Sequence, residues 1–248
     1  MTNELIQTMS AHRSIRKFTD QDISDEQISL ITDAARWAPS SHHVQAYSII
    51  VIRNNEKKET LSSLTGGQRW VEECPVFLVI CADYHRIEEA SKRHNQSLEI
   101  GGAEQLLVGA VDAALVAQNL LLAAESMGLG GVMIGGIRNQ PEEVTNLLDL
   151  PPSTFPVMGL CLGYPNQDIA QKPRLPKDAS VFYESYQRTS IPKSLDEYNE
   201  TMLTYYGTRQ TNAKQQTWSE QMASYMGKPN RPHINEFLRK QGFLTDLK

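Results

Sequence analysis

The chain has 248 residues, 40% of them apolar, and a formal net charge of −5 at neutral pH. This length suits one large domain, and the acidic balance argues against a nucleic-acid-binding protein, which normally presents a basic face. The three cysteines, Cys74, Cys81 and Cys161, form no Cys-x-x-Cys pair and no cluster with histidine, so we expect buried structural thiols and no metal site.

The first half of the chain is expected to alternate helices with short strands. Ser24 and Gln27 have the form of a capping box, which marks a helix start, and no signal peptide is visible. The expected elements are a helix over residues 1–10, a helix from Ser24 to about Ala38, a strand over 46–53, a short helix closed by Gly66 and Gly67, and a buried strand over 76–82.

The segment from Glu104 to Met127 has apolar side chains on nearly every face of a helix. Such a helix has to be buried on all sides. It is therefore predicted to lie between two subunits or, alternatively, at the centre of a monomer. Its polar residues, including Asp112 and Glu125, argue against a membrane span. A reducing cytoplasm fits all of these features.

The second half of the chain contains fewer strands. Residues 132–134 and 156–163 predict strands, and Pro141 begins a helix at its favoured first position. Beyond Lys172 the chain is polar and helical, with a last helix near residues 233–240. The irregular alternation predicts an α+β layered sandwich. We expect a single domain over residues 1–248, with a helical C-terminal extension from about residue 195.

A cluster of polar and cationic residues follows the first helix, at His12, Arg13, Ser14, Ile15, Arg16 and Lys17. Arginine offers a planar fork of donors and serine a neutral donor, which suits a phosphate group. Taken alone, the cluster is equally compatible with a solvated basic turn.

A second cationic stretch is Lys172-Pro173-Arg174. Proline biases the preceding residue toward an extended conformation, and alternate side chains of an extended chain share one face. Lys172 and Arg174 can therefore point at the same anion. The alternative is an ordinary surface loop.

Glycines flank the short strand within residues 130–136, Gly-Gly-Val-Met-Ile-Gly-Gly. This is not the dinucleotide fingerprint, in which a glycine-rich turn opens a helix. A residue without a Cβ lets the backbone approach a flat ring closely, although the glycines are also explained as turn residues only.

Six separated motifs occur in one order: His-Arg-Ser-Ile-Arg at 12–16, Ala-Pro-Ser-Ser at 38–41, Thr-Gly-Gly-Gln at 65–68, Gly-Leu-Gly-Gly-Val-Met-Ile-Gly-Gly at 128–136, Gly-Leu-Cys-Leu-Gly at 159–163 and Lys-Pro-Arg-Leu-Pro at 172–176. Together they resemble the oxygen-insensitive nitroreductases. The match is to the larger, NADPH-preferring branch, which includes bacterial NADPH–FMN oxidoreductases and flavin reductases. It extends from His12 to the C-terminus.

The resemblance implies an FMN-binding homodimer with a small, mostly antiparallel sheet wrapped by helices. Segments are exchanged between the subunits, and FMN lies at their interface. It also implies reduction of nitroaromatics, quinones or free flavin by NADPH in two-electron ping-pong steps, with the chemistry at flavin N5 and no catalytic side chain.

Matching positions give the expected FMN-binding residues: His12, Arg13, Ser14, Ile15, Arg16, Ser40, Ser41, Gln68, Ile134, Gly135, Gly136, Lys172 and Arg174. By this resemblance His12, Ser14, Lys172 and Arg174 surround the phosphate. Arg16 reaches the ribityl chain or the pyrimidine edge of the flavin, where a cation stabilises the anionic reduced ring.

For NADPH and substrate, the resemblance points to Arg209, Lys214 and His42. Lys214 stands where some relatives have arginine, and lysine binds phosphate as a point charge rather than as a fork. His42 stands where some relatives have serine, so we expect it to influence the choice of acceptor. Arg209 and Lys214 are alternatively a solvated helix end.

Two other classes of function compete with this hypothesis. One is a non-redox flavin-binding or flavin-modifying protein on the same fold, which would oxidise NADPH negligibly. The other is an interaction protein without a cofactor, whose basic clusters lie on the surface. Partners expected from the resemblance are small-molecule electron acceptors and a second copy of the chain, with no nucleic acid and no membrane.

Overall fold

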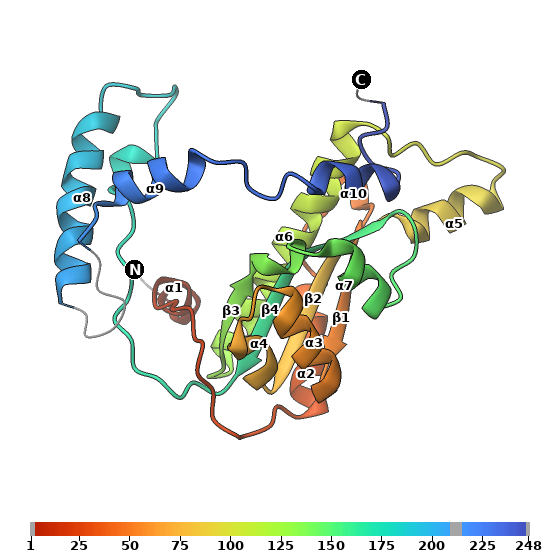
Figure 1. Ribbon diagram of the computed structural model, residues 1–248, viewed down its shortest axis with the longest axis horizontal. Coiled ribbons are helices and arrows are strands. Elements are labelled where there is room, and N and C mark those ends of the chain that lie inside the picture. Colours follow the sequence, from red (N-terminus) through yellow and green to blue (C-terminus); the bar gives the residue numbers. More distant parts are fainter. Residues whose placement is uncertain (1–2, 209–214, 247–248) are drawn as a thin grey trace. The chain divides into compact units, whose positions relative to one another are not determined.

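The computed structural model describes residues 3–208 and 215–246 (Figure 1). They form two compact units. The first contains the chain up to Ile169 and again from Arg231, and the second spans Ala170–Asn230. The prediction of a single domain with a helical extension stays a prediction.

A four-stranded sheet organises the first unit, with strands β1 (Tyr47–Ile52), β2 (Val76–Asp83), β3 (Gly130–Ile134) and β4 (Thr154–Gly163). The strand order is β1-β2-β4-β3, and every neighbouring pair is antiparallel. Every residue of central β2 is buried, which is why its sequence is a continuous apolar run. The predicted small antiparallel sheet is confirmed.

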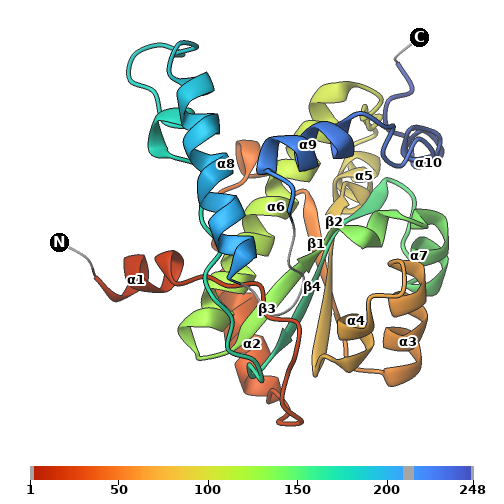
Figure 2. The same cartoon turned by 60° about the vertical axis from the view of Figure 1, so that its left-hand side comes forward.

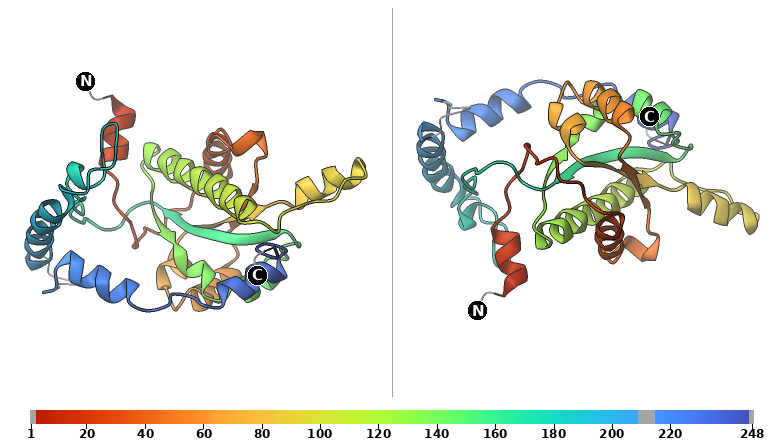
Figure 3. Two further views of the ribbon diagram at one scale, coloured as in Figure 1. Left: turned by 90° about the horizontal axis from the view of Figure 1, so that it is seen from above. Right: turned by 90° about the horizontal axis from the view of Figure 1, so that it is seen from below.

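Helices cover both faces of this sheet (Figures 2 and 3). The first unit contains α1 (Glu4–Ser10), α2 (Asp25–Ala35), α3 (Asn55–Leu64), α4 (Arg69–Glu73), α5 (His85–Arg93), α6 (Ala103–Ser126), α7 (Pro141–Leu147) and α10 (Ile234–Lys240), with 3-10 turns at Ser41–His43 and Gly135–Arg138.

Alternate residues of β2 enter two separate cores, because successive side chains of a strand point to opposite faces. Leu78 and Ile80 pack with α2 and α6 on one face. Phe77 and Val79 pack with α3, α4 and α7 on the other. The result is the layered α+β sandwich that the sequence predicts.

Helix α6 differs from the expectation of burial on all sides. Its inner face packs on the sheet, but Leu107, Val111 and Leu115 are 59%, 53% and 38% exposed. They lie four residues apart and so form one stripe. The alternative prediction, that α6 lies at the centre of a monomer, is therefore wrong for the face that carries this stripe. By length and composition α6 could cross a membrane, yet its buried Asp112 and packed inner face make it a core helix.

Most predicted element boundaries agree with the structure to within a few residues. The Ser24 capping box is present, but its helix ends at Ala35 rather than about Ala38. Two helices, α4 and α5, were not predicted. Helix α5 contains only two apolar residues, Ile87 and Ala90, which is too few to mark a helix by apolar periodicity.

The second unit is helical, with α8 (Ile191–Gly207), α9 (Trp218–Met226) and a 3-10 turn at Lys177–Ala179. Its small core consists of Tyr198, Met202 and Tyr206. Tyr198 also meets the ring of Trp218 edge to face, with centroids 5.5 Å apart. The predicted polar, helical tail is confirmed for its described residues.

Candidate functional site

The loop of residues 12–17 is docked against the start of β3. Ser14 pairs with Gly131 in a parallel bridge, and the Ile15 N–H donates to the Gly131 carbonyl at 2.9 Å. Ile15 is buried, and a Cβ on Gly130 would lie 2.6 Å from its side chain. The glycines at 130 and 131 thus have a packing role, and the loop is an ordered element rather than a solvated turn.

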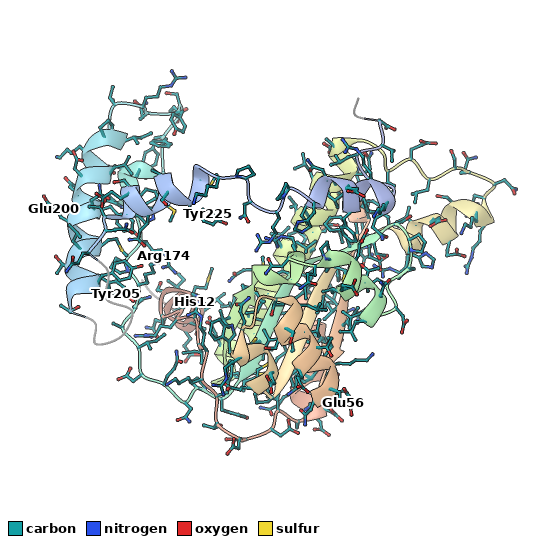
Figure 4. All side chains as sticks on the ribbon, viewed as in Figure 1. His12, Glu56, Arg174, Glu200, Tyr205 and Tyr225 are labelled. Atoms are coloured by element: carbon teal, nitrogen blue, oxygen red, sulfur yellow. The ribbon has the colours of Figure 1, made fainter. Side chains whose placement is uncertain are left out.

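His12 is held by a carboxylate near the end of α6. Its Nδ1 lies 2.5 Å from Oε1 of Glu125, and Figure 4 marks His12 just after α1. A hydrogen bond to one ring nitrogen orients the imidazole, which leaves Nε2 as the nitrogen for a ligand. Sequence reasoning missed Glu125, although an acidic residue inside an apolar helix was a usable signal.

Arg13 and Arg16 hydrogen-bond to neutral carbonyl groups. Arg13 Nε donates to the Ile169 carbonyl at 3.0 Å and its Nη1 to Ala11 at 2.8 Å. Arg16 Nη1 donates to the Ser14 carbonyl at 3.3 Å. Within residues 3–208 and 215–246, no carboxylate forms an ion pair with either guanidinium. Both charges are therefore available to an anion.

Trp70 connects the cationic loop to helix α4. The Arg16 guanidinium lies 5.6 Å from the centroid of the Trp70 ring, a distance at which a cation is attracted by the ring face. No sequence motif pointed to Trp70, but it stands two residues after the predicted Gln68. Arg16 and Gln68, distant in sequence, are thus brought to the same region of the site.

Gln68 also meets the glycines that follow β3. Its Nε2 donates to the Thr65 carbonyl at 2.8 Å, and a Cβ on Gly136 would lie 2.4 Å from that nitrogen. At Gly135 the nearest atom would be 3.4 Å away, at the end of the Arg138 side chain. Gly136 therefore has a packing role, whereas a Cβ on Gly135 would meet only the end of the flexible Arg138 side chain. Ile134 is buried beside them.

Ser40, Ser41 and His42 lie at a different part of the first unit. The Ser41 N–H donates to Asp112 Oδ1 at 3.1 Å, so this loop lies beside the turn of α6 that contains Asp112. His12 lies beside the turn that contains Glu125. At a rise of 1.5 Å per residue, Asp112 and Glu125 are about 20 Å apart along the helix. Within one chain, these residues are not brought together with His12–Arg16.

The Lys172-Pro173-Arg174 stretch belongs to the second unit, where it lies against α8. Tyr198 Oη donates to the Pro173 carbonyl at 3.0 Å, and Lys172 Nζ lies 6.0 Å from the centre of the Tyr206 ring. Burial raises the pKa of Tyr198, and the positive charge of Arg174 partly opposes this rise. Figure 4 shows Arg174 beside the helix.

Neither Lys172 nor Arg174 forms an ion pair with a carboxylate among the described residues. Their charges are thus available to an anion, like those of Arg13 and Arg16. That the two cationic stretches meet around one phosphate stays a prediction. Arg209 and Lys214, predicted to bind NADPH, lie outside the described residues.

Comparison with known families gives matches along nearly the whole chain. The profile described as "Nitroreductase family" matches residues 9–68 and 58–164. A second profile, "Nitroreductase family, C-terminal domain", matches residues 172–246.

Curated relatives and solved structures agree with these profiles. The chain is 45% identical to an oxygen-insensitive NADPH nitroreductase of Salmonella typhimurium, covering 97% of this chain and 98% of the relative. It is 42% identical to an NADPH-flavin oxidoreductase of Vibrio harveyi, with 97% and 98% covered. A solved hypothetical oxidoreductase from Bacillus subtilis superposes with a TM-score of 0.95 at 41% identity, covering 98% of each chain.

A structure of the Vibrio harveyi NADPH:FMN oxidoreductase with NAD+ superposes with a TM-score of 0.89 at 40% identity, covering 98% of this chain and 99% of that one. The family resemblance seen in the six motifs and the α+β fold is thereby confirmed. This chain belongs to the nitroreductase family.

Proposed function

We propose that this protein is an FMN-dependent oxidoreductase that takes electrons from NADPH and reduces nitroaromatics, quinones or free flavin. One observation carries the proposal: a docked loop presents Arg13 and Arg16 without a carboxylate partner among the described residues. Such a loop is suited to bind an anion such as a phosphate group. The names of its full-length relatives, NADPH nitroreductase and NADPH-flavin oxidoreductase, support the same activity.

The charges of the proposed site residues suit FMN. His12, Ser14, Lys172 and Arg174 would hold the phosphate, with Arg13 and Ile15 in the same loop. A dianionic phosphate matches several cations, and each charge-assisted hydrogen bond contributes about 1.5–3 kcal/mol. This is enough to retain a cofactor after the ordering costs of binding.

The backbone at Gly135, where a Cβ would meet only the end of the Arg138 side chain, would face the flat ring, with Ile134, Gly136 and Gln68 beside it. Bound FMN would supply the redox chemistry, carrying two electrons from NADPH to an acceptor in ping-pong fashion. Arg16 would contribute a fixed positive charge next to the ring, where it stabilises negative charge. The Trp70 ring, 5.6 Å from the Arg16 guanidinium, would help to hold this charge there. No side chain has to act as nucleophile or general base.

Three residues are proposed for NADPH and the acceptor. Arg209 and Lys214 would bind the 2′-phosphate of NADPH, which distinguishes it from NADH. His42 follows the two serines proposed to contact the flavin, so it would shape the space that the acceptor enters.

We also propose that the protein acts as a homodimer with FMN at the interface. The apolar stripe of Leu107, Val111 and Leu115 on α6 is exposed in the single chain, and an exposed apolar stripe favours a protein partner. Ser41 and His12 contact residues of α6 that are about 20 Å apart along the helix. A two-fold arrangement could place Ser40, Ser41 and His42 of one subunit near the phosphate-binding loop, residues 12–17, of the other. A cytoplasmic protein without nucleic-acid or membrane partners is part of the same proposal.

The proposal is tested on the purified protein after reconstitution with FMN. We expect a yellow protein whose flavin absorbance bleaches when NADPH is added without oxygen. A colourless protein that remains free of FMN after reconstitution would rule out the assignment. A protein that binds FMN but oxidises NADPH negligibly with any acceptor would instead be a non-redox flavin-binding protein.

The acceptor is tested separately, by steady-state rates with nitrofurazone, a benzoquinone and free FMN. We expect one of the three to give a clearly higher kcat/KM. Equal values would mean that activity measurements do not identify the physiological acceptor.

A further inference from the structure

The loop that joins α2 to β1, residues 40–46, has an unusual backbone. His42, His43 and Gln45 have φ angles of 46°, 57° and 53°. Residues other than glycine rarely adopt this left-handed backbone conformation. It persists where the surrounding structure imposes it. Something in the fold must therefore hold the 40–46 loop in shape.

A single buried carboxylate bridges the two ends of this loop. Asp112 on α6 is 1% exposed. Its Oδ1 accepts the N–H of Ser41 at 3.1 Å, and its Oδ2 accepts the N–H of Ala46 at 3.0 Å. Within the described residues no cation forms an ion pair with Asp112, so the loop N–H groups are the donors that satisfy its charge.

A second charged group holds the loop from its carbonyl side. Arg86 donates to the carbonyls of Gln45 at 2.9 Å and Tyr47 at 2.5 Å. Asp83 orients the guanidinium through a 2.7 Å ion pair. Inside the loop, the Gln45 N–H donates to Ser40 Oγ at 3.3 Å. Asp112 thus binds backbone N–H groups at both ends of the loop, and Arg86 binds backbone carbonyls at its C-terminal end.

We infer that Asp112 is a positioning residue, which fixes the 40–46 loop so that Ser40, Ser41 and His42 present a constant surface to the flavin and the acceptor. The inference rests on the proposed function, because that function assigns these three residues to the site. Asp112 itself acts through the loop. An asparagine at this position keeps one acceptor oxygen but turns an NH2 group toward a backbone N–H, so one of the two bonds is lost.

The test compares Asp112→Asn with Val116→Ala. Val116 lies one turn further along the same face of α6 and is equally buried, so its truncation disturbs the core without touching these hydrogen bonds. In Asp112→Asn we expect faster hydrogen exchange at the one of the Ser41 and Ala46 amides that loses its acceptor. We also expect an FMN Kd raised about tenfold, and an acceptor KM that rises more than kcat falls. Val116→Ala should show none of these changes.

Exchange in the unmodified protein tests the same idea without a variant that has to fold. The Ser41 and Ala46 amides should exchange far more slowly than the amide of His42. Equal exchange, or an Asp112→Asn protein indistinguishable from Val116→Ala, would overturn the inference. If the unmodified protein fails to oxidise NADPH, the proposed function fails, whereas the exchange result still decides whether Asp112 fixes the loop.

Discussion

Two adjacent glycines at the end of β3 should respond differently to the same small change. A Cβ at Gly136 would lie 2.4 Å from Gln68 Nε2 and 2.5 Å from the Thr65 carbonyl oxygen. The glutamine can move, but the carbonyl belongs to the backbone. We therefore expect Gly136→Ala to cost about 1–3 kcal/mol from overpacking. Displacing Gln68 also breaks its bond to Thr65, which adds about 1 kcal/mol.

Gly135→Ala provides the matched control. Its new methyl group would approach only the end of the Arg138 side chain, at 3.4 Å. Its conformation is not left-handed, so alanine fits the backbone. We expect a change in the free energy of unfolding within about 0.5 kcal/mol. Because this methyl group enters the space proposed for the flavin ring, FMN affinity should fall instead.

Urea unfolding of the two apoproteins measures both effects. With an m value of about 2–3 kcal/mol/M, Gly136→Ala should lower the midpoint by about 1 M while leaving m unchanged. Equal midpoints for the two variants would refute the reasoning from close contacts. An FMN Kd that is unchanged in Gly135→Ala would show that the ring lies elsewhere.

The remaining predictions concern the phosphate, the coenzyme and a buried thiol. Replacing Lys172 and Arg174 together with alanine should weaken FMN binding at least about 100-fold, so that dialysis releases the flavin; flavin retained after dialysis would show that the phosphate is held by other residues. Replacing Arg209 and Lys214 with alanine should abolish a preference for NADPH over NADH on the order of 30- to 150-fold, measured as the ratio of kcat/KM; an unchanged ratio would remove both residues from the coenzyme site. Burial, and secondarily the charge of Asp83, raises the pKa of Cys81 to about 12. The unfolded chain loses this thiol proton near pH 9 while the folded chain keeps it, so the free energy of unfolding should decrease between pH 9 and 12. Cys81→Ala should flatten this decrease in urea unfolding at several pH values, and a slope equal to that of the unmodified protein would contradict the assignment.

Elements with a strong local signal were predictable from the sequence. The apolar run of β2 and the capping box of α2 each specify their own structure within a few residues. Helix α5 gave only a weak signal, because Ile87 and Ala90 are its only apolar residues. Helix α6 has apolar residues all round, and the sequence could not show which side packs on the sheet and which remains exposed in one chain.

The site was predicted in its parts but not in its connections. The six motifs pointed to His12, Gln68 and the glycines, and the structure relates them through contacts between distant residues. The bridge from Ser14 to Gly131 and the packing of Gln68 against Gly136 depend on how the sheet is assembled. Periodicity within a segment carries no information about such pairs.

The contacts of two carboxylates on α6 were likewise not predictable from the sequence. Asp112 and Glu125 were noticed only as polar interruptions that argue against a membrane helix. In the structure each binds a loop of the site: Asp112 holds residues 41 and 46, and Glu125 holds His12. A charged residue in an otherwise apolar helix is costly to bury, so such a residue is a good candidate for a partner far away in sequence.

Helix α6 acts as a spacer of fixed length, because Asp112 and Glu125 tie two separate loops to one continuous run of helical turns. Inserting one residue between them would move everything beyond it by 1.5 Å and rotate it by about 100°. Glu125 would then face away from His12 while Asp112 kept its loop. Relatives should therefore preserve the number of residues between these carboxylates, even where surface segments such as α5 gain or lose several.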